Sequence, residues 1–250
     1  MAQYDFTSQT ALITGSTSGI GRQAALKLAA GGVHVIVSGR DAGRGQDVVA
    51  TIRDSGGAAD FVAADLSDLD SVRSLAAEAS RLGNGHVDIL VNNAGVFPFG
   101  PTASVDASTF DAVMAVNVRA PYFLVGALAP AMAERGHGAI VNLSTMVATF
   151  GMAEMSLYGS SKAALQLLTK SWSAEFGPRG VRVNTVSPGP TRTEGTEAMG
   201  DGLDQQAAGA PAGRVGLAAE VADAIVFLSS DAASHIHGVV LPVDGGRLAV

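Results

Sequence analysis

Short apolar runs rich in β-branched residues alternate with amphipathic helical stretches along almost the whole chain, and this alternation is the strongest constraint on its fold. Two strands separated by a helix in this way are joined by a right-handed crossover and lie parallel in one sheet. No linker, repeat or low-complexity stretch interrupts the pattern, so residues 1–250 are expected to form a single domain. Strands are expected at residues 10–14, 33–38, 58–63, 87–91, 138–143, 181–186 and 239–243.

The predicted fold is therefore an α/β, doubly wound domain of the Rossmann type, with a mostly parallel seven-stranded sheet and helices on both faces. A long helix over residues 104–132 is expected to bend or break around Pro121, because proline has no backbone N–H to donate. Pro242, in the last strand, is typical of an edge strand. Residues 194–213 contain many Gly and Ala and little apolar periodicity, which predicts a mobile lid over the site.

Charge and composition exclude several classes of function. The formal net charge is −7 and no run of lysine and arginine occurs, so neither nucleic acid nor an anionic membrane surface is an expected partner. The chain has no cysteine, which excludes disulfides and thiolate catalysis. His235 and His237 are the only close histidine pair and have no acidic ligand nearby, so no metal site is expected. Without a long apolar run or a signal-peptide pattern in residues 1–8, the expected location is cytoplasmic.

The first predicted strand ends in a glycine-rich turn, Gly15-Ser16-Thr17-Ser18-Gly19-Ile20-Gly21, which leads into a helix. Glycines at such a turn let the backbone approach a pyrophosphate, and the helix N-terminus offers free N–H groups and the positive end of its dipole. The G-x-x-x-G-x-G spacing differs from the G-x-G-x-x-G of long dehydrogenases. The turn therefore indicates a dinucleotide site, with a plain glycine-rich turn as the alternative.

The second predicted strand is followed by Gly39 and Arg40, at the point where an NAD site would place Asp or Glu to hold the ribose 2′-hydroxyl. A carboxylate would repel a 2′-phosphate, whereas a guanidinium group can bind one through two hydrogen bonds. Arg40 therefore favours NADP(H) and leaves NAD(H) possible. The alternative is that Arg40 is a solvated loop residue and Asp41 caps the next helix, and both interpretations can hold together.

Tyr158 and Lys162 lie four residues apart in a predicted helix, so their side chains share one face. A tyrosine hydroxyl normally has a pKa of about 10, and a nearby ammonium group lowers it by favouring the phenolate. Such a pair can exchange a proton with an alcohol or carbonyl oxygen. Taken alone, Tyr-x-x-x-Lys is more often an ordinary surface pair, so its interpretation depends on the motifs around it.

Taken together, these motifs resemble the short-chain dehydrogenase/reductase family from Thr14 to Asp244. The resemblance implies an NAD(P)-dependent oxidoreductase that transfers a hydride between a nicotinamide and a carbonyl or secondary alcohol. The motifs follow the family's order: Thr14-Gly15-x-x-x-Gly19-Ile20-Gly21, Asp65, Asn92-Asn93-Ala94-Gly95, Asn117, Tyr158-x-x-x-Lys162 and Pro188-Gly189.

The resemblance also implies a role for each matched residue. Tyr158 would be the catalytic acid and base, Lys162 would hold the nicotinamide ribose and tune the tyrosine, and Asn117 would hold a water that relays protons to Lys162. The remaining implied cofactor contacts are Gly15, Ser18, Ile20 and Gly21 at the phosphates and ribose, Asp65 and Leu66 at the adenine, Asn92, Ala94 and Gly95 along the ribose, and Pro188, Gly189, Thr191 and Thr193 at the carboxamide.

One position departs from the family pattern, which places a serine 13 residues before the tyrosine. That position is Thr145 in this chain, and Ser144 lies one residue too early. A threonine keeps a hydroxyl that can hydrogen bond the substrate oxygen, while its methyl group restricts the side chain and narrows the pocket. Thr145 is therefore expected to take the serine role, with Ser144 as the alternative if the loop is irregular.

Apolar side chains near the motifs, among them Phe97, Phe99, Met146 and Met155, indicate an uncharged and fairly apolar carbonyl or alcohol substrate. Alternatively, many of them pack against a second subunit, and the resemblance implies a homo-oligomer, usually a tetramer. A second class of function stays open because of Thr145: a catalytically weak NAD(P)-binding regulatory module.

Overall fold

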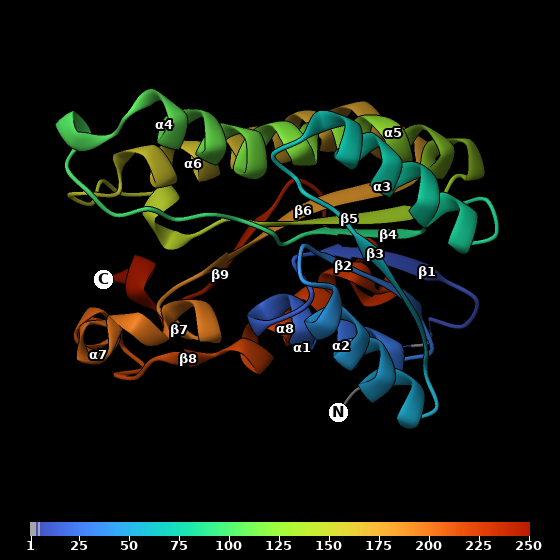
Figure 1. Ribbon diagram of the computed structural model, residues 1–250, viewed down its shortest axis with the longest axis horizontal. Helices are drawn as coiled ribbons and strands as arrows, with labels where there is room; N and C mark the ends of the chain where they lie inside the picture. Colours follow the sequence, from blue (N-terminus) through green and yellow to red (C-terminus); the bar gives the residue numbers. More distant parts are fainter. Residues whose placement is uncertain (1–3, 5) are drawn as a thin grey trace.

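A seven-stranded parallel sheet forms the centre of the molecule, in the order β3-β2-β1-β4-β5-β6-β9 (Figure 1). The computed structural model describes Tyr4 and residues 6–250. The sheet is thus the predicted doubly wound, Rossmann-type sheet, and every pairing in it is parallel. Its strands are β1 (Thr10–Thr14), β2 (His34–Gly39), β3 (Ala58–Ala63), β4 (Ile89–Asn92), β5 (Gly138–Leu143), β6 (Val181–Pro188) and β9 (Val240–Val243).

Helices cover both faces of this sheet, as Figure 1 shows. The helices of one face are α1 (Gly19–Ala30), α2 (Ala42–Asp54) and α8 (Ala218–Ser229). Those of the other face are α3 (Leu69–Leu82), α4 (Ala107–Met114), α5 (Ala120–Arg135) and α6 (Ser156–Phe176). Because both faces are covered, the central strands need apolar residues at every position, and this explains their continuous apolar runs.

Strand β1 illustrates how the core is divided. Ala11 and Ile13 belong to the core beneath α1 and α8, whereas Leu12, between them, belongs to the core beneath α3 and α5. All three side chains are fully buried. Successive residues of a strand point to opposite faces, so one short run anchors both helical layers to the sheet.

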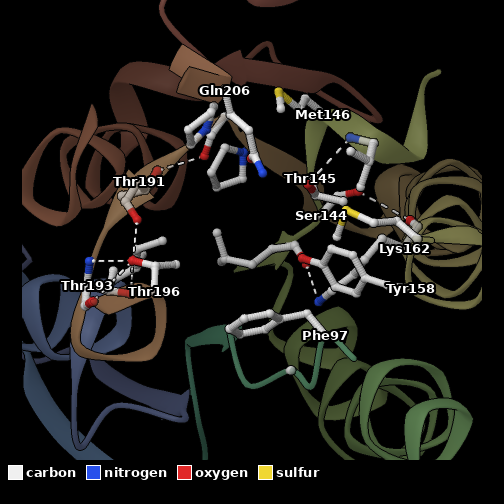
Figure 2. A pocket seen from close by; sticks show the side chains of 18 of the residues that line it. Phe97, Ser144, Thr145, Met146, Tyr158, Lys162, Thr191, Thr193, Thr196 and Gln206 are labelled. Atoms are coloured by element: carbon white, nitrogen blue, oxygen red, sulfur yellow. Dashed lines mark hydrogen bonds between the residues drawn. The ribbon is translucent and has the colours of Figure 1, made fainter. Parts of the chain in front are cut away.

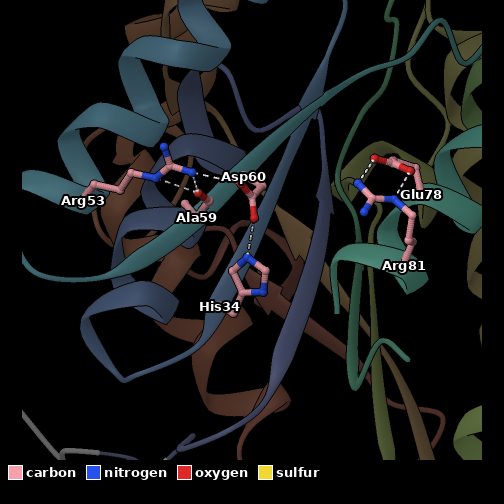
Figure 3. Close-up of polar contacts among 6 residues, drawn as sticks. All are labelled: His34, Arg53, Ala59, Asp60, Glu78 and Arg81. Atoms are coloured by element: carbon pink, nitrogen blue, oxygen red, sulfur yellow. Dashed lines mark hydrogen bonds and ion pairs between the residues drawn. The ribbon is translucent and has the colours of Figure 1, made fainter. Parts of the chain in front are cut away.

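The strand β3 lies at one edge of the sheet and is held by polar contacts (Figure 3). Asp60 accepts a hydrogen bond from Arg53 at 2.9 Å and lies 2.8 Å from the ring nitrogen Nε2 of His34. Arg53 also donates to the carbonyl of Ala59 at 2.6 Å. Charged side chains on an edge strand discourage pairing with another chain. Pro242 lies in β9, the opposite edge, as predicted.

The long apolar helix is interrupted as predicted, but by a π-helical turn, Ala115–Arg119, that joins α4 to α5. Pro121 lies in the first turn of α5, where its missing N–H is tolerated. The joined segment, Ala107–Arg135, is long and apolar enough to cross a membrane, yet half of its most apolar window is buried in the fold. We therefore interpret its apolar character as that of a core helix that packs against α3 and α6.

Residues 194–213 contain regular structure that the sequence pattern did not predict. They form a 3-10 segment, Glu194–Met199, and a short helix, α7 (Asp201–Ala208). They lie between two short strands, β7 (Thr191–Arg192) and β8 (Gly216–Leu217), which pair with each other. We call residues 194–213 the lid segment, and its mobility stays a prediction.

Candidate active site

The carboxyl ends of β1, β4, β5 and β6 meet at one edge of the sheet, where two cavities adjoin. The first, which we call the Tyr158 cavity, is lined by Thr145, Tyr158 and Lys162, by the stretch that follows β6, and by the lid segment. The second, the glycine-turn cleft, extends from Gly15 to Arg40, Asp65 and Leu66. Ile20, Asn93, Gly95, Phe97 and Thr193 line both, so the two cavities form a continuous site.

Tyr158 and Lys162 enter the first cavity from one face of α6, as their spacing predicts. Burial raises the pKa of Tyr158 to about 12, and the neighbouring hydroxyl of Thr145 offsets only part of that increase. Burial also lowers the pKa of Lys162 to about 8. The Nζ atom of Lys162 donates to the carbonyl of Leu143 at 2.7 Å.

The expectation that the pKa of Tyr158 lies below its ordinary value is therefore wrong for this structure, because burial raises that pKa. The ammonium group of Lys162 is directed to the Leu143 carbonyl, and desolvation of the phenol outweighs every favourable contact that its ionised form makes. At neutral pH, Tyr158 carries its proton and can donate it. This is the form that a carbonyl substrate needs, because reduction adds a proton to the carbonyl oxygen.

Thr145 and Ser144, the two candidates for the serine role of the family, lie in different surroundings. The hydroxyl of Thr145 lies near enough to Tyr158 to lower the pKa of the phenol, and its Oγ1 accepts the N–H of Val147 at 3.5 Å. Ser144 accepts from Gln166 at 2.9 Å and donates to the backbone carbonyl of Lys162 at 3.3 Å. Thr145 is thus the hydroxyl that accompanies Tyr158, while Ser144 ties β5 to α6.

Asn117 is fully buried in the π-helical turn and reaches across to the loop after β4. Its Oδ1 accepts the N–H of Val96 at 2.9 Å, and its Nδ2 donates to the carbonyl of Val96 at 2.9 Å. The same Nδ2 donates to Ser161 at 3.0 Å, and Ser161 donates to the carbonyl of Tyr158 at 2.7 Å. The side chain thus holds the loop against α6, and the water relay assigned to Asn117 stays a prediction. No sequence pattern pointed to Ser161, whose hydroxyl connects the two segments.

The glycine turn packs closely against the loop after β4. A Cβ atom on Gly21 would come within 2.4 Å of the Nδ2 atom of Asn93, and one on Gly15 within 2.9 Å of Ala94. Gly15 and Gly19 also have φ angles of +63° and +53°, which favour glycine. Asn93 supports the turn by donating to the carbonyl of Gly15 at 3.0 Å. Asn93, which the sequence analysis passed over, lines the cleft, whereas Asn92 is buried and donates to Asn142 at 2.8 Å.

The N-terminus of α1 faces the cleft and attracts an anion in this structure. Ser18 is the N-cap residue, but its side chain makes no capping hydrogen bond. The N–H of Gly19 instead donates to the Oε2 atom of Glu194, at the start of the lid segment, at 2.9 Å. A helix N-terminus binds phosphate for the same reason that it binds this carboxylate. Open N–H groups and a glycine cradle therefore fit a dinucleotide pyrophosphate at this point.

The far end of the cleft contains the residues expected at the adenine and the 2′ position. Arg40 is exposed and lines the cleft with Asp65 and Leu66. Hydrogen bonds from the backbone N–H and the hydroxyl of Ser67 lower the pKa of Asp65, and the charge of Arg40 contributes less. The guanidinium group of Arg40 thus lies near enough to act on this carboxylate and on a ligand in the cleft. Asp41 caps α2, as the alternative interpretation expects, and the binding of a 2′-phosphate by Arg40 stays a prediction.

The predicted carboxamide contacts lie on the opposite wall of the Tyr158 cavity. Pro188, Gly189, Thr191 and Thr193 all line it. Thr191 donates to the carbonyl of Gly189 at 2.9 Å, which fixes the turn after β6. Figure 2 shows Thr191 and Thr193 across the cavity from Tyr158 and Lys162. Among residues 4 and 6–250, no group of His, Asp and Glu side chains could hold a metal ion.

Known proteins are similar to this chain in both sequence and architecture. A family model described as Enoyl-(Acyl carrier protein) reductase matches residues 15–247. The 3-oxoacyl-[acyl-carrier-protein] reductase FabG of Escherichia coli (strain K12) is 35% identical over 249 residues, which cover 98% of this chain and 100% of that protein.

Two solved structures extend the comparison. A short chain dehydrogenase/reductase family protein is 50% identical, with a TM-score of 0.92 over 98% of this chain and 100% of its own. A gluconate 5-dehydrogenase from Burkholderia cenocepacia J2315, in complex with NADP and tartrate, is 32% identical, with a TM-score of 0.93 over 99% of this chain and 98% of its own. The chain therefore belongs to the short-chain dehydrogenase/reductase family and is an NAD(P)-dependent oxidoreductase that acts on CH–OH and C=O groups.

Proposed function

We propose that this protein transfers a hydride between NADP(H) and an uncharged, fairly apolar ketone or secondary alcohol. The observation that carries the proposal is that the hydroxyls of Tyr158 and Thr145 both line a largely apolar cavity that continues into the glycine-turn cleft. The nicotinamide supplies or accepts the hydride at the substrate carbon. The residues of this chain position the reactants and move the proton.

In the reducing direction, Tyr158 donates its proton to the carbonyl oxygen while Thr145 hydrogen bonds the same oxygen. The resulting phenolate is stabilised by the nearby cation of Lys162, whose ammonium is held in place by Leu143. Lys162 also holds the nicotinamide ribose, and Asn117 fixes the loop that carries Gly95 against both groups. In the oxidising direction the same groups act in reverse, with Tyr158 as the base.

The preference for NADP(H) rests on Arg40. Its guanidinium group lines the open end of the cleft, and none of the hydrogen bonds or ion pairs between described residues involves it. A free guanidinium can bind a 2′-phosphate through two charge-assisted hydrogen bonds. The gluconate 5-dehydrogenase described above also holds NADP, which supports this choice.

The preference for an uncharged substrate rests on the cavity walls. Among the residues that the structure describes, Lys162 is the only charged side chain that lines the Tyr158 cavity, and its ammonium group donates to the carbonyl of Leu143. Phe97, Met155 and Leu203 give the walls an apolar character. A carboxylate or phosphate placed there would lose its hydration without gaining a counter-ion.

The test is a panel of ketones, secondary alcohols and one trans-2-enoyl thioester, with NADPH and NADH as alternative cofactors. Turnover of apolar ketones with NADPH is the expected result. Tight cofactor binding with no turnover of any compound would favour the regulatory module, and turnover of the enoyl thioester alone would favour reduction of C=C. Arg40→Gln should lower the ratio of NADPH to NADH efficiency about tenfold or more, whereas Arg44→Gln, at a residue outside the cleft, should leave the ratio unchanged.

We also propose that the protein is a homo-oligomer, a tetramer or a dimer, that forms through the outer face of α4, α5 and α6. Phe110, Tyr122, Phe123 and Leu167 are exposed there, between 37% and 66% of their surface. Apolar side chains gathered on one face are typical of a subunit interface. Light scattering of the purified protein tests the assembly, and Leu167→Glu should dissociate it. The cytoplasmic location stays a prediction, which cell fractionation can test.

A further inference from the structure

One polar side chain that lines the Tyr158 cavity has neither a part in the proposed reaction nor a hydrogen-bond partner among the described residues. Gln206, in α7, lines the cavity and is half-buried, and no hydrogen bond of its carboxamide is present among the described residues. The other polar groups of the lid side are engaged. Thr196 donates to the carbonyl of Thr191 at 2.9 Å and accepts the N–H of Thr193 at 3.0 Å. Gln206 is therefore free to bind a ligand.

The packing of α7 holds Gln206 on the inner side of the helix. Leu203 and Ala207, one turn before and one residue after it, are 3% and 2% exposed and pack with Val215. Gln205, its neighbour in sequence, is exposed and does not line the cavity. Figure 2 shows Gln206 on the side of the cavity opposite Phe97.

The rest of the wall limits what such a carboxamide can recognise. It carries no charge, donates through nitrogen and accepts through oxygen, so it suits a neutral carbonyl or hydroxyl group. The neighbouring lining residues of the lid, Met199 and Leu203, have apolar side chains that cannot hydrogen bond the further polar groups of a more hydrophilic ligand. A substrate rich in hydroxyls would leave most of them without partners, at a cost for each one.

We propose that Gln206 is a specificity-determining residue that hydrogen bonds a second, uncharged oxygen of the substrate. The substrate class is then a ketone or secondary alcohol with an apolar body and one further neutral oxygen, carried by an ester, thioester or hydroxyl group. This inference rests on the proposed function. It also separates the protein from the gluconate dehydrogenase with the same fold, whose named substrate is a sugar acid.

The test compares three ketones of similar length: a 3-oxo ester, a hydroxy ketone and a simple ketone with no second oxygen. Gln206→Leu should lower kcat/KM for both oxygenated ketones by about three- to tenfold, mainly through KM, and leave the simple ketone unchanged or improved. The matched control is Gln205→Leu, the same substitution one residue away on the outer side of α7, which should leave all three values unchanged. Loss for only one oxygenated ketone identifies which oxygen, carbonyl or hydroxyl, the carboxamide binds.

A gain-of-function variant gives a second test. Gln206→Lys should add turnover of a keto acid of the same length, because it places a cation on the wall that lacks one. Equal losses on all three ketones in Gln206→Leu, no loss at all, or efficient turnover of the keto acid by the wild-type protein would each overturn the proposal.

Failure of the proposed function would be seen separately. Wild-type turnover of the simple ketone tests hydride transfer without involving Gln206. If no ketone is turned over, binding of the same three compounds to the complex of the protein with NADP⁺ is read from thermal shifts. In that measurement, Gln206→Leu should still weaken binding of the two oxygenated compounds alone, and equal binding of all three would overturn the role of Gln206.

Discussion

The two walls of the Tyr158 cavity are built in opposite ways. The wall of β5, α6 and the π-helical turn is buried, and side-chain hydrogen bonds tie its elements together. The lid wall is mostly exposed and has a small core of its own around Leu203, Ala207 and Val215. The groups proposed to move the proton thus lie where geometry is held firmly, and the residue proposed to select a substrate lies in the segment that is predicted to be mobile.

The two walls of the Tyr158 cavity also differ in how they are attached to the rest of the fold. Lys162 is 3% exposed and Asn117 is fully buried, and both bond backbone groups of other segments. The lid reaches α1 through the side chain of Glu194 and reaches the C-terminal turn through the N–H of Ala212, which donates to Gly245 at 2.9 Å. We therefore expect substitutions in the first wall to change turnover and substitutions in the lid to change binding. The four predictions below test this division, from the largest effect to the smallest.

Tyr158→Phe should lower kcat by about a thousandfold or more, because it removes the proton donor and leaves the ring in place. Affinity for NADP⁺ and the melting temperature should stay near the wild-type values. Tyr122→Phe, at an exposed tyrosine on α5, is the matched control and should keep full turnover. Near-native turnover of Tyr158→Phe would show that the proton comes from elsewhere.

Thr145→Val should lower kcat about a hundredfold, since valine keeps the shape of threonine but cannot hydrogen bond the substrate oxygen. Thr145→Ser should stay within about threefold of the wild type, because it keeps the hydroxyl. Steady-state kinetics of the two Thr145 variants and of Ser144→Ala decide which hydroxyl takes the serine role. A larger loss in Ser144→Ala than in Thr145→Val would transfer the role to Ser144.

Activity in the reducing direction should fall as pH rises through about 8, the pKa to which burial lowers Lys162. Below that pH Lys162 is charged and can stabilise the phenolate, and above it the charge is lost. Tyr158, with its pKa raised to about 12, keeps its proton throughout this range. The quantity to measure is kcat/KM for NADPH, which reports the free enzyme and should fall about tenfold per pH unit on the alkaline side. A flat profile between about pH 7 and about pH 9.5 would contradict the role of Lys162.

Glu194→Gln should tighten NADP⁺ binding by about two- to fivefold, the smallest of the four effects. In this structure the carboxylate of Glu194 accepts the N–H of Gly19, where the pyrophosphate is expected, so a neutral side chain should compete less well. Glu197→Gln removes the same charge from the same 3-10 segment without a bond to α1 and serves as the control. Fluorescence titration measures both variants. Equal tightening in both variants would show that the effect comes from the loss of a negative charge in this segment and not from the contact between Glu194 and Gly19.

The same contact offers a test of lid mobility. When the pyrophosphate displaces Glu194, the lid segment loses its link to α1 and has to form new contacts over the cofactor. Hydrogen exchange of residues 194–213 should therefore change on cofactor binding, while exchange in α6 stays nearly constant. Unchanged exchange in the lid would contradict its predicted mobility.

The fold and the position of the site could be predicted from residues close together in sequence. The seven strands, the parallel sheet and the Pro242 edge strand were confirmed. Strands that are buried on both faces have continuous apolar runs, and a proline without an N–H is typical of an edge strand, so both features can be recognised within a few residues of sequence. The helix α7 and the strands β7 and β8 were missed. Their apolar residues pack in a small separate cluster, so the segment has no long periodic stripe.

For single side chains of the site, too, local sequence patterns predicted some properties and missed others. The spacing of Tyr158 and Lys162 placed both in one cavity, but it could not give the pKa of the tyrosine, which burial controls. No role was predicted for Ser161 or Asn93, because their hydrogen bonds reach segments 44 and 78 residues away. No local pattern identifies Gln206, whose inward position depends on the packing of Leu203 and Ala207.

The sequence by itself determined the order of strands and helices, the glycine turn, and the hydroxyl and amine that share one face of α6. These properties follow from steric limits and periodicities that act within a few residues. The tertiary structure alone decided which way the Lys162 ammonium is directed, which hydroxyl accompanies Tyr158, and that Glu194 lies on the N-terminus of α1. Desolvation and hydrogen bonding depend on atoms brought together from distant segments, and those neighbours exist only once the chain has folded.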